Sequence, residues 1–133
     1  VDISIGTPGA NSLMVEWTPG NYFSLFNDAG NAHGTAYVQG TAVDLSNSQG
    51  VLHVQSSSST TSGNTRIITL SQHYNPGYGG TKAMYVVAGG SQGHDGWHNL
   101  GNWSTGSYGP VPITTLQSPA SGGLGSLPHT ICW

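Results

Sequence analysis

Glycine and proline interrupt the chain so often that long helices have little room. The two longest stretches free of both residues, Val51–Ser62 and Asn64–Asn75, are 12 residues each. Both are rich in β-branched or hydroxyl-bearing side chains, which disfavour helix interiors. Neither places apolar residues at the i, i+3, i+4, i+7 spacing of an amphipathic helix. The pattern therefore predicts a protein with almost no helix.

Alternating apolar and polar residues mark a series of strands separated by turn residues. Val1–Ile5 alternates along its whole length and stops at a Gly-Thr-Pro-Gly segment. The other predicted strands are Ser12–Trp17, Tyr22–Phe26, Thr35–Val38, Thr41–Leu45, Val51–Val54, Arg66–Tyr74 and Lys82–Ala88. The last two are the strongest, and we expect them to form a central antiparallel pair joined by a turn over Asn75–Thr81. About eight such strands predict an all-β fold, either an antiparallel β-sandwich or a partly closed barrel.

The pattern changes after Gly89, where the chain becomes loop-like and aromatic residues stand among glycines. From residue 110 onward it consists largely of glycine, proline and serine with scattered aliphatic residues. We therefore predict a β-domain over residues 1–109 and an extended C-terminal arm over residues 110–133. The arm is expected to pack on its own domain or on a neighbouring subunit. Ser56–Ser62 is a low-complexity polar stretch and is predicted to be a mobile loop.

Charged side chains are scarce, and this narrows the function classes. Only 5% of the 133 residues are charged, against roughly 25% in an average soluble protein. Arg66 and Lys82 are the only fixed cations, too few for a nucleic-acid backbone or an anionic membrane surface. No apolar run is long enough for membrane insertion as a helix. A polar, uncharged surface tolerates close packing of identical copies, which favours a homo-oligomer in an extracellular setting or on a virion surface.

The most suggestive chemistry lies between residues 94 and 103. Trp97 and Trp103 are accompanied there by Asn99 and Asn102. Sugars present apolar C–H faces and hydroxyl rims, so their sites combine aromatic plates with amide or carboxylate hydrogen-bonding groups. The segment is a candidate carbohydrate-binding site, although the tryptophans would also serve as core anchors of a loop. Tyr74 and Tyr78, which flank an Asn-Pro-Gly turn, form a second candidate surface.

Metal binding and catalysis are weaker interpretations of the same residues. His94, Asp95 and His98 could converge on Zn²⁺ or Ca²⁺ from a loop, but the H-E-x-x-H pattern of zinc hydrolases is absent. No other cofactor is expected. Glu16 is the only glutamate, and no G-x-S-x-G nucleophile motif occurs. The sequence therefore predicts a protein that is not an enzyme. Cys132 is the only cysteine, so an intrachain disulfide is excluded, while a buried free thiol and an intermolecular bond stay open.

Several short motifs resemble the knob-type β-domains of bacteriophage tail fibres and bacteriocin fibres. They are a short strand at Gly50–Val54, the Gln72-His73-Tyr74 segment, a Lys82–Val86 strand and a closing segment from Gly96-Trp97 to Trp103. The resemblance spans residues 50–103, about two-fifths of the chain, and the two tryptophans are farther apart than is usual in those domains. It implies a receptor-binding domain of a trimeric fibre that contacts bacterial surface glycans.

Three functions are therefore expected, in descending order. The first is a non-enzymatic surface-recognition domain of a virion, a phage fibre component for host-cell attachment through cell-surface carbohydrate. It predicts an exposed Trp97 or Trp103 beside Asn99 or Asn102. The alternative is a structural subunit of a capsid, tail or extracellular filament, with buried intersubunit tryptophans and no ligand. The third is a free-standing secreted lectin.

Overall fold

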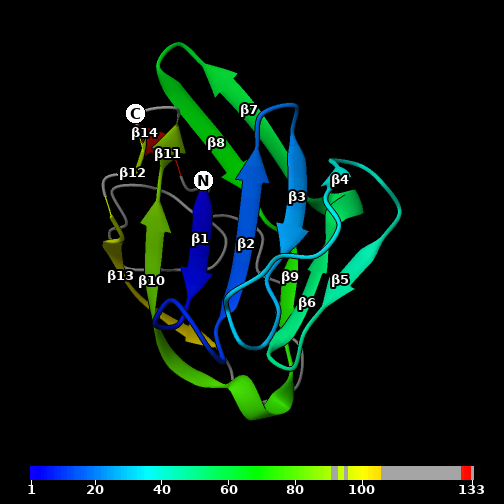
Figure 1. The fold of residues 1–133 in the computed structure, drawn as a ribbon, viewed down its shortest axis with the longest axis vertical. Coiled ribbons are helices and arrows are strands. Elements are labelled where there is room, and N and C mark those ends of the chain that lie inside the picture. The colour runs from blue at the N-terminus through cyan, green and yellow to red at the C-terminus, as the bar shows by residue number, and fades with distance from the viewer. Residues whose placement is uncertain (91–92, 95, 106–129, 133) are drawn as a thin grey trace.

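The protein is built from antiparallel β-strands throughout the part of the chain that the computed structural model describes, residues 1–90, 93–94, 96–105 and 130–132 (Figure 1). The predicted all-β, antiparallel fold is confirmed. The helices in these ranges are two 3-10 turns of three residues each, η1 (Val54–Ser56) and η2 (Pro76–Tyr78). Within the same ranges no helix has the length and apolar character needed to cross a lipid bilayer.

The largest sheet has six strands in the order β13-β10-β1-β2-β3-β4. Its strands are β1 (Asp2–Ile5), β2 (Leu13–Thr18), β3 (Tyr22–Leu25), β4 (Tyr37–Val38), β10 (Gly80–Val87) and β13 (His98–Thr105). Figure 1 shows β10, β1, β2 and β3 side by side. The sheet therefore joins the N-terminal strands to the strands after residue 80.

Two three-stranded sheets and one short hairpin complete the described fold. The first has the order β5-β6-β9, the second β14-β8-β7, and the hairpin joins β11 to β12. Their strands are β5 (Asp44–Ser46), β6 (Gly50–His53), β7 (Ser58–Ser62), β8 (Thr65–Thr69), β9 (Gln72–Tyr74), β11 (Gly89–Gly90), β12 (Gly93–His94) and β14 (Thr130–Cys132). In Figure 1 the β7–β8 ribbon reaches past the end of the β2–β3 hairpin.

The sheets share one hydrophobic core. Every second residue of β1, β2, β3 and β10 points into it, as the period-two pattern requires. The opposite wall comes from the segments between β6 and η2. The core residues are Ile3, Ile5, Leu13, Val15, Trp17, Phe23, Leu25, Leu52, Val54, Ile68, Leu70, Tyr74, Tyr78, Met84, Val86 and Trp103. Because side chains from different sheets meet in one cluster, the arrangement is that of a sandwich.

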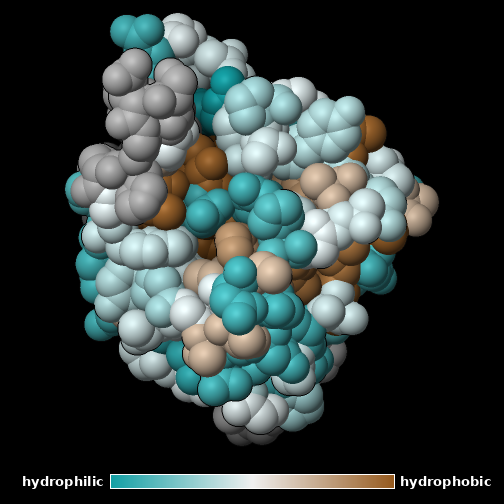
Figure 2. Space-filling view, viewed as in Figure 1, coloured by the Kyte–Doolittle hydropathy of each residue, from teal (hydrophilic) through white to brown (hydrophobic). Residues whose placement is uncertain are grey.

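The outer surface is polar without being strongly charged. Figure 2 shows teal and pale residues over most of the face seen in Figure 1, with brown hydrophobic residues in small patches. This agrees with a sequence in which glycine, serine, threonine and asparagine take the place of lysine and glutamate.

The predicted central pair of Arg66–Tyr74 and Lys82–Ala88 is wrong. β10 pairs with β1 and β13, whereas the Arg66–Tyr74 run is divided into β8 and β9, which belong to different sheets. The connection before β10 contains η2, closed by a hydrogen bond from Tyr78 N to Asn75 O at 2.8 Å. Tyr78 is anchored in the core against the β1–β2 connection, so the chain crosses between sheets here.

Two segments predicted to be loops are strands. Most of the Ser56–Ser62 stretch forms β7, which pairs with β8 from Ser58↔Thr69 to Ser62↔Thr65. The segment after Gly89 contains β13, an eight-residue strand beside β10. Sequence pattern underrates both, because serine, glycine and asparagine have low intrinsic strand preference. Pairing with a neighbouring strand supplied the hydrogen bonds that stabilise them.

Most of the predicted C-terminal arm, residues 106–129 and 133, lies outside the described residues. Its described end, β14, pairs antiparallel with β8 of the same domain, from Thr130↔Ile67 to Cys132↔Thr65. The environment of the Cys132 side chain also lies outside what the structure describes.

Candidate functional site

Three of the aromatic residues predicted to bind carbohydrate are core residues. Trp103 is 3% exposed, Tyr74 2% and Tyr78 8%. The Tyr74 and Tyr78 rings pack with their centroids 5.8 Å apart, and burial raises the pKa of both phenols. Side chains buried to this degree do not present a plate to a ligand at the surface.

Tyr78 acts as a tie between distant parts of the chain. Its hydroxyl donates a hydrogen bond to the Ile5 carbonyl oxygen and accepts one from the Leu13 amide at 3.3 Å. These partners lie 73 and 65 residues away in sequence. The Lys82 ammonium stands 4.5 Å from the centre of its ring, which is the geometry of a cation–π contact. The Asn-Pro-Gly turn therefore serves to position a core residue.

The remaining predicted sugar-binding residues lie on the edge strand of the six-stranded sheet or next to it. Trp97 is 38% exposed, and Asn99 and Asn102 are exposed as well. In the β10–β13 register Asn99 stands opposite Tyr85 and Asn102 opposite Ala83. The Asn99 side-chain oxygen accepts a hydrogen bond from the Gly101 amide at 2.7 Å. These three residues are thus exposed, and their role as a carbohydrate site stays a prediction.

Of the three predicted metal ligands, the structure describes the side chain of His98. Asp95 and the side chain of His94 lie outside the described residues, and His98 is exposed at the start of β13. Among the side chains that are described, no group of three or more His, Cys, Asp or Glu residues converges on a point.

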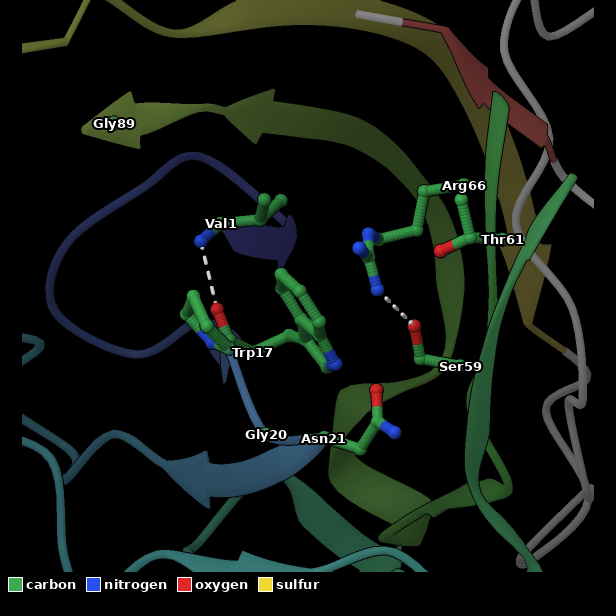
Figure 3. Close-up of a pocket in the computed structure, with 9 residues that line it drawn as sticks. Val1, Trp17, Gly20, Asn21, Ser59, Thr61, Arg66 and Gly89 are labelled. Carbon is green, nitrogen blue, oxygen red and sulfur yellow. Dashed lines mark hydrogen bonds between the residues drawn. The ribbon is translucent and has the colours of Figure 1, made fainter. Parts of the chain in front are cut away.

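A pocket of about 590 Å³ lies between the β2–β3 hairpin and the β7–β8 ribbon (Figure 3). It is surrounded by residues of both hairpins, by Val1 and by Gly89 at the start of β11. Its described lining residues are Val1, Trp17, Pro19, Gly20, Asn21, Ser59, Thr61, Arg66 and Gly89. The pocket therefore forms where the shared core ends and polar side chains replace apolar ones.

Local sequence explains both walls of this pocket. On one side, Gly20 and Asn21 have positive φ angles of 93° and 62°, which glycine and asparagine tolerate better than other residues. The resulting tight turn holds the Asn21 side chain beside the pocket. On the other side, Arg66 pairs with Thr61 in the β7–β8 register. Arg66 shares its strand face with the fully buried Ile68 two residues on, so that face runs from the core into the pocket.

Trp17 and Arg66 form the centre of the site. The Arg66 guanidinium carbon lies 4.1 Å from the centre of the Trp17 ring, and its Nη1 donates to Ser59 Oγ at 3.1 Å. Trp17 is 6% exposed, and backbone hydrogen bonds to Val1 of 2.7 and 2.8 Å hold it in place. Figure 3 shows its indole nitrogen directed toward the side chains of Asn21 and Ser59. That Nε1–H is buried and has no hydrogen-bond partner among the described residues.

Sequence reasoning missed this pocket. Trp17 fits a strand pattern, and Asn21 and Ser59 are unremarkable in so polar a chain. One signal was available. Arg66 stands two residues before an isoleucine in an alternating run, on the face that should be buried. A charged residue at such a position requires a partner or a ligand.

A second polar cluster crosses the β5-β6-β9 sheet. His53 Nδ1 lies 2.7 Å from Asp44 Oδ1, and His53 Nε2 lies 2.8 Å from His73 Nδ1. Since His53 donates to the carboxylate, its Nε2 is the acceptor for an N–H of His73 when both rings are neutral. The rings are 4.9 Å apart between centroids. The chain of contacts ties three neighbouring strands together and fixes the tautomer of His53.

No protein-family model, curated protein sequence or solved structure matches the chain in the three comparisons made with known proteins.

Proposed function

We propose that this domain is a non-enzymatic carbohydrate-recognition module and that its binding site is the pocket beside Trp17. The observation that carries the proposal is the indole Nε1–H of Trp17, which is buried without a hydrogen-bond partner among the described residues. An unsatisfied buried donor costs about 1–3 kcal/mol. A hydroxyl or carbonyl oxygen of a bound sugar would supply the missing acceptor.

The shape and lining of the pocket support the same function. Its volume of about 590 Å³ lies within the range usual for small-molecule sites, roughly 300–1,000 Å³. Pro19 offers apolar surface for the C–H face of a sugar ring, while Asn21, Ser59 and Thr61 offer hydrogen-bonding groups for its hydroxyls. The recognition hypothesis requires this mixture of apolar and hydrogen-bonding groups, although the residues that supply it in the pocket are not those predicted from the sequence.

The chemistry of the lining favours binding over turnover. None of the described lining residues carries a carboxylate, an imidazole or a thiol. Glycoside hydrolysis commonly needs two carboxyl groups about 5–9.5 Å apart. The groups in the pocket can donate and accept hydrogen bonds and make apolar contacts, which are the interactions of a lectin-like site.

The setting that we propose is the surface of a virion, as the tip of a homo-oligomeric fibre that attaches to a host cell. The resemblance of residues 50–103 to knob-type fibre domains supports it, and so does the scarcity of charge. The exposed edge at Trp97, Asn99 and Asn102 would then be the alternative glycan contact.

The test is a glycan-array screen of the purified protein with two substitutions that separate the sites, Asn21→Ala at the pocket and Trp97→Ala at the edge. The mass in solution and the melting temperature are recorded for each variant. We expect Asn21→Ala to weaken binding by roughly tenfold, the effect of one lost hydrogen bond to a ligand, and Trp97→Ala to change it little. The reverse pattern would move the site to β13. A blank array from a folded oligomer would contradict recognition and favour a structural subunit.

A further inference from the structure

We propose that the pocket selects sugars that carry a carboxylate and that Arg66 is the residue that reads this charge. The inference rests on the proposed carbohydrate-binding function and specifies its substrate class. It starts from the distribution of charge. The chain has two fixed cations among 133 residues, and one of them lines the pocket.

Arg66 lacks a counter-ion within the described part of the chain. The ion pairs there are His33 with Glu16 and His53 with Asp44, and no carboxylate lines the pocket. A guanidinium has five N–H donors, and Arg66 uses one of them on the Ser59 hydroxyl. A half-buried cation with unused donors beside a pocket is a ready partner for an anion.

The guanidinium is also held in one orientation before a ligand arrives. Its contact with the Trp17 ring at 4.1 Å and its hydrogen bond to Ser59 hold it at two points. A planar, fixed fork matches the two oxygens of a carboxylate, which it binds with two parallel hydrogen bonds. Pre-organisation of this kind reduces the entropy that binding would otherwise lose.

The unpaired Trp17 donor sits beside the same cation. Its Nε1–H points to the side of the pocket that Asn21 and Ser59 share. In an acidic sugar, ring and hydroxyl oxygens lie within a few ångströms of the carboxylate. One ligand can therefore place its carboxylate on the Arg66 guanidinium and a second oxygen on the Trp17 Nε1–H. A single cation is too little for a polyphosphate, whose binding draws on several Lys or Arg contacts. The arrangement therefore fits a uronic or sialic acid better than a nucleotide or nucleic acid.

The experiment uses an array of bacterial surface polysaccharides, each printed in its native acidic form and in carboxyl-reduced form. Sulfated glycans form a separate arm, because a sulfate ester is another singly charged anion that a guanidinium binds. The proteins are the wild type, Arg66→Gln, Arg66→Lys and Lys82→Gln. The last variant removes the other fixed cation and is the matched control.

We expect the wild type to prefer native over carboxyl-reduced polysaccharides by roughly tenfold or more, the effect of one charge-assisted hydrogen-bond pair. Arg66→Gln should reduce that preference to about twofold or less while binding to neutral sugars persists. Arg66→Lys should keep part of the preference, because it retains the charge without the fork. Lys82→Gln should bind as the wild type does. A higher salt concentration should weaken the preference.

Two results would overturn the inference and leave carbohydrate binding intact. One is equal binding to native and carboxyl-reduced polysaccharides, and the other is a preference for sulfated glycans over carboxylated ones. A preference that survives in Arg66→Gln would show that another group reads the charge, which also overturns it. No binding to any arm by folded protein would defeat the proposed function as well.

Discussion

The substitution Tyr78→Phe tests the assignment of this residue to the core. It removes one oxygen atom and leaves the ring, which is 8% exposed and packs on Tyr74. The hydroxyl joins η2 to the end of β1 and the start of β2, through Ile5 O and Leu13 N. Removal of the hydroxyl therefore deletes two long-range contacts without creating a large cavity.

The expected cost follows from those two contacts. A buried hydrogen bond contributes a net ~1 kcal/mol, and an orphaned buried partner costs about 1–3 kcal/mol. The hydrogen bond from the Leu13 amide is long at 3.3 Å, so we place the cost of losing it at the lower end of that range. We expect Tyr78→Phe to lower the free energy of unfolding by about 2–3 kcal/mol. The matched control is Tyr74→Phe, whose hydroxyl makes one 3.3 Å bond to the Gln72 side chain, with an expected loss of ~1 kcal/mol.

Urea unfolding followed by tryptophan fluorescence measures both variants, with the slope of the transition checked for constancy. A loss below about 0.5 kcal/mol for Tyr78→Phe, the scale of an ordinary surface substitution, would refute the reasoning. A loss no greater than that of Tyr74→Phe would refute it too. Either result would mean that the Tyr78 hydroxyl does not stabilise the core, and Tyr78 would again be a candidate for ligand binding.

Three further predictions concern the core, a strand contact and a tautomer. Burial raises the pKa of Tyr74 and Tyr78, because the folded protein favours the neutral phenols. The free energy of unfolding that depends on these neutral phenols is fully present below the ordinary phenol pKa of about 10 and is lost as the pH rises above it. Two of the six tyrosines should ionise at 295 nm only as the protein unfolds, and ionisation of all six in folded protein would contradict this. Gly50→Ala should destabilise by ~2 kcal/mol, because a Cβ there would collide with the His73 carbonyl, whereas Gly77→Ala, which meets nothing within 4 Å, should be near neutral in thermal unfolding. Nitrogen-15 NMR of neutral His53 should show the proton on Nδ1, and a proton on Nε2 would be incompatible with the observed hydrogen bonds.

The strand pattern was largely legible in the sequence because alternation is a local property. Val1–Ile5, Ser12–Trp17 and Tyr22–Phe26 each carry an inward and an outward set of side chains, and each became a strand within a residue or two of its predicted bounds. The serine-rich β7 was missed for the opposite reason. It has no alternation of apolar and polar residues, and its pairing with β8 is what makes it a strand.

The candidate site was harder to predict, because its members are distant in sequence. Trp17, Asn21 and Arg66 come from two hairpins that meet only when the sheets pack. The aromatic residues that looked like a site, Trp103 and Tyr78, are covered by partners that no local pattern names. Residue type alone does not tell a plate at the surface from an anchor in the core.

The sequence by itself determined an all-β chain, a polar surface almost without charge and the places of the strands with clear alternation, such as β1, β2 and β3. These follow from side-chain alternation, from glycine and proline, and from composition, all of which act over a few residues. The tertiary structure decided which strands are neighbours, which aromatic rings are buried and where Arg66 meets Trp17. The physical reason is that strand pairing and burial join residues as distant in sequence as Asp2 and Val87, and only the packed sheets bring them into contact.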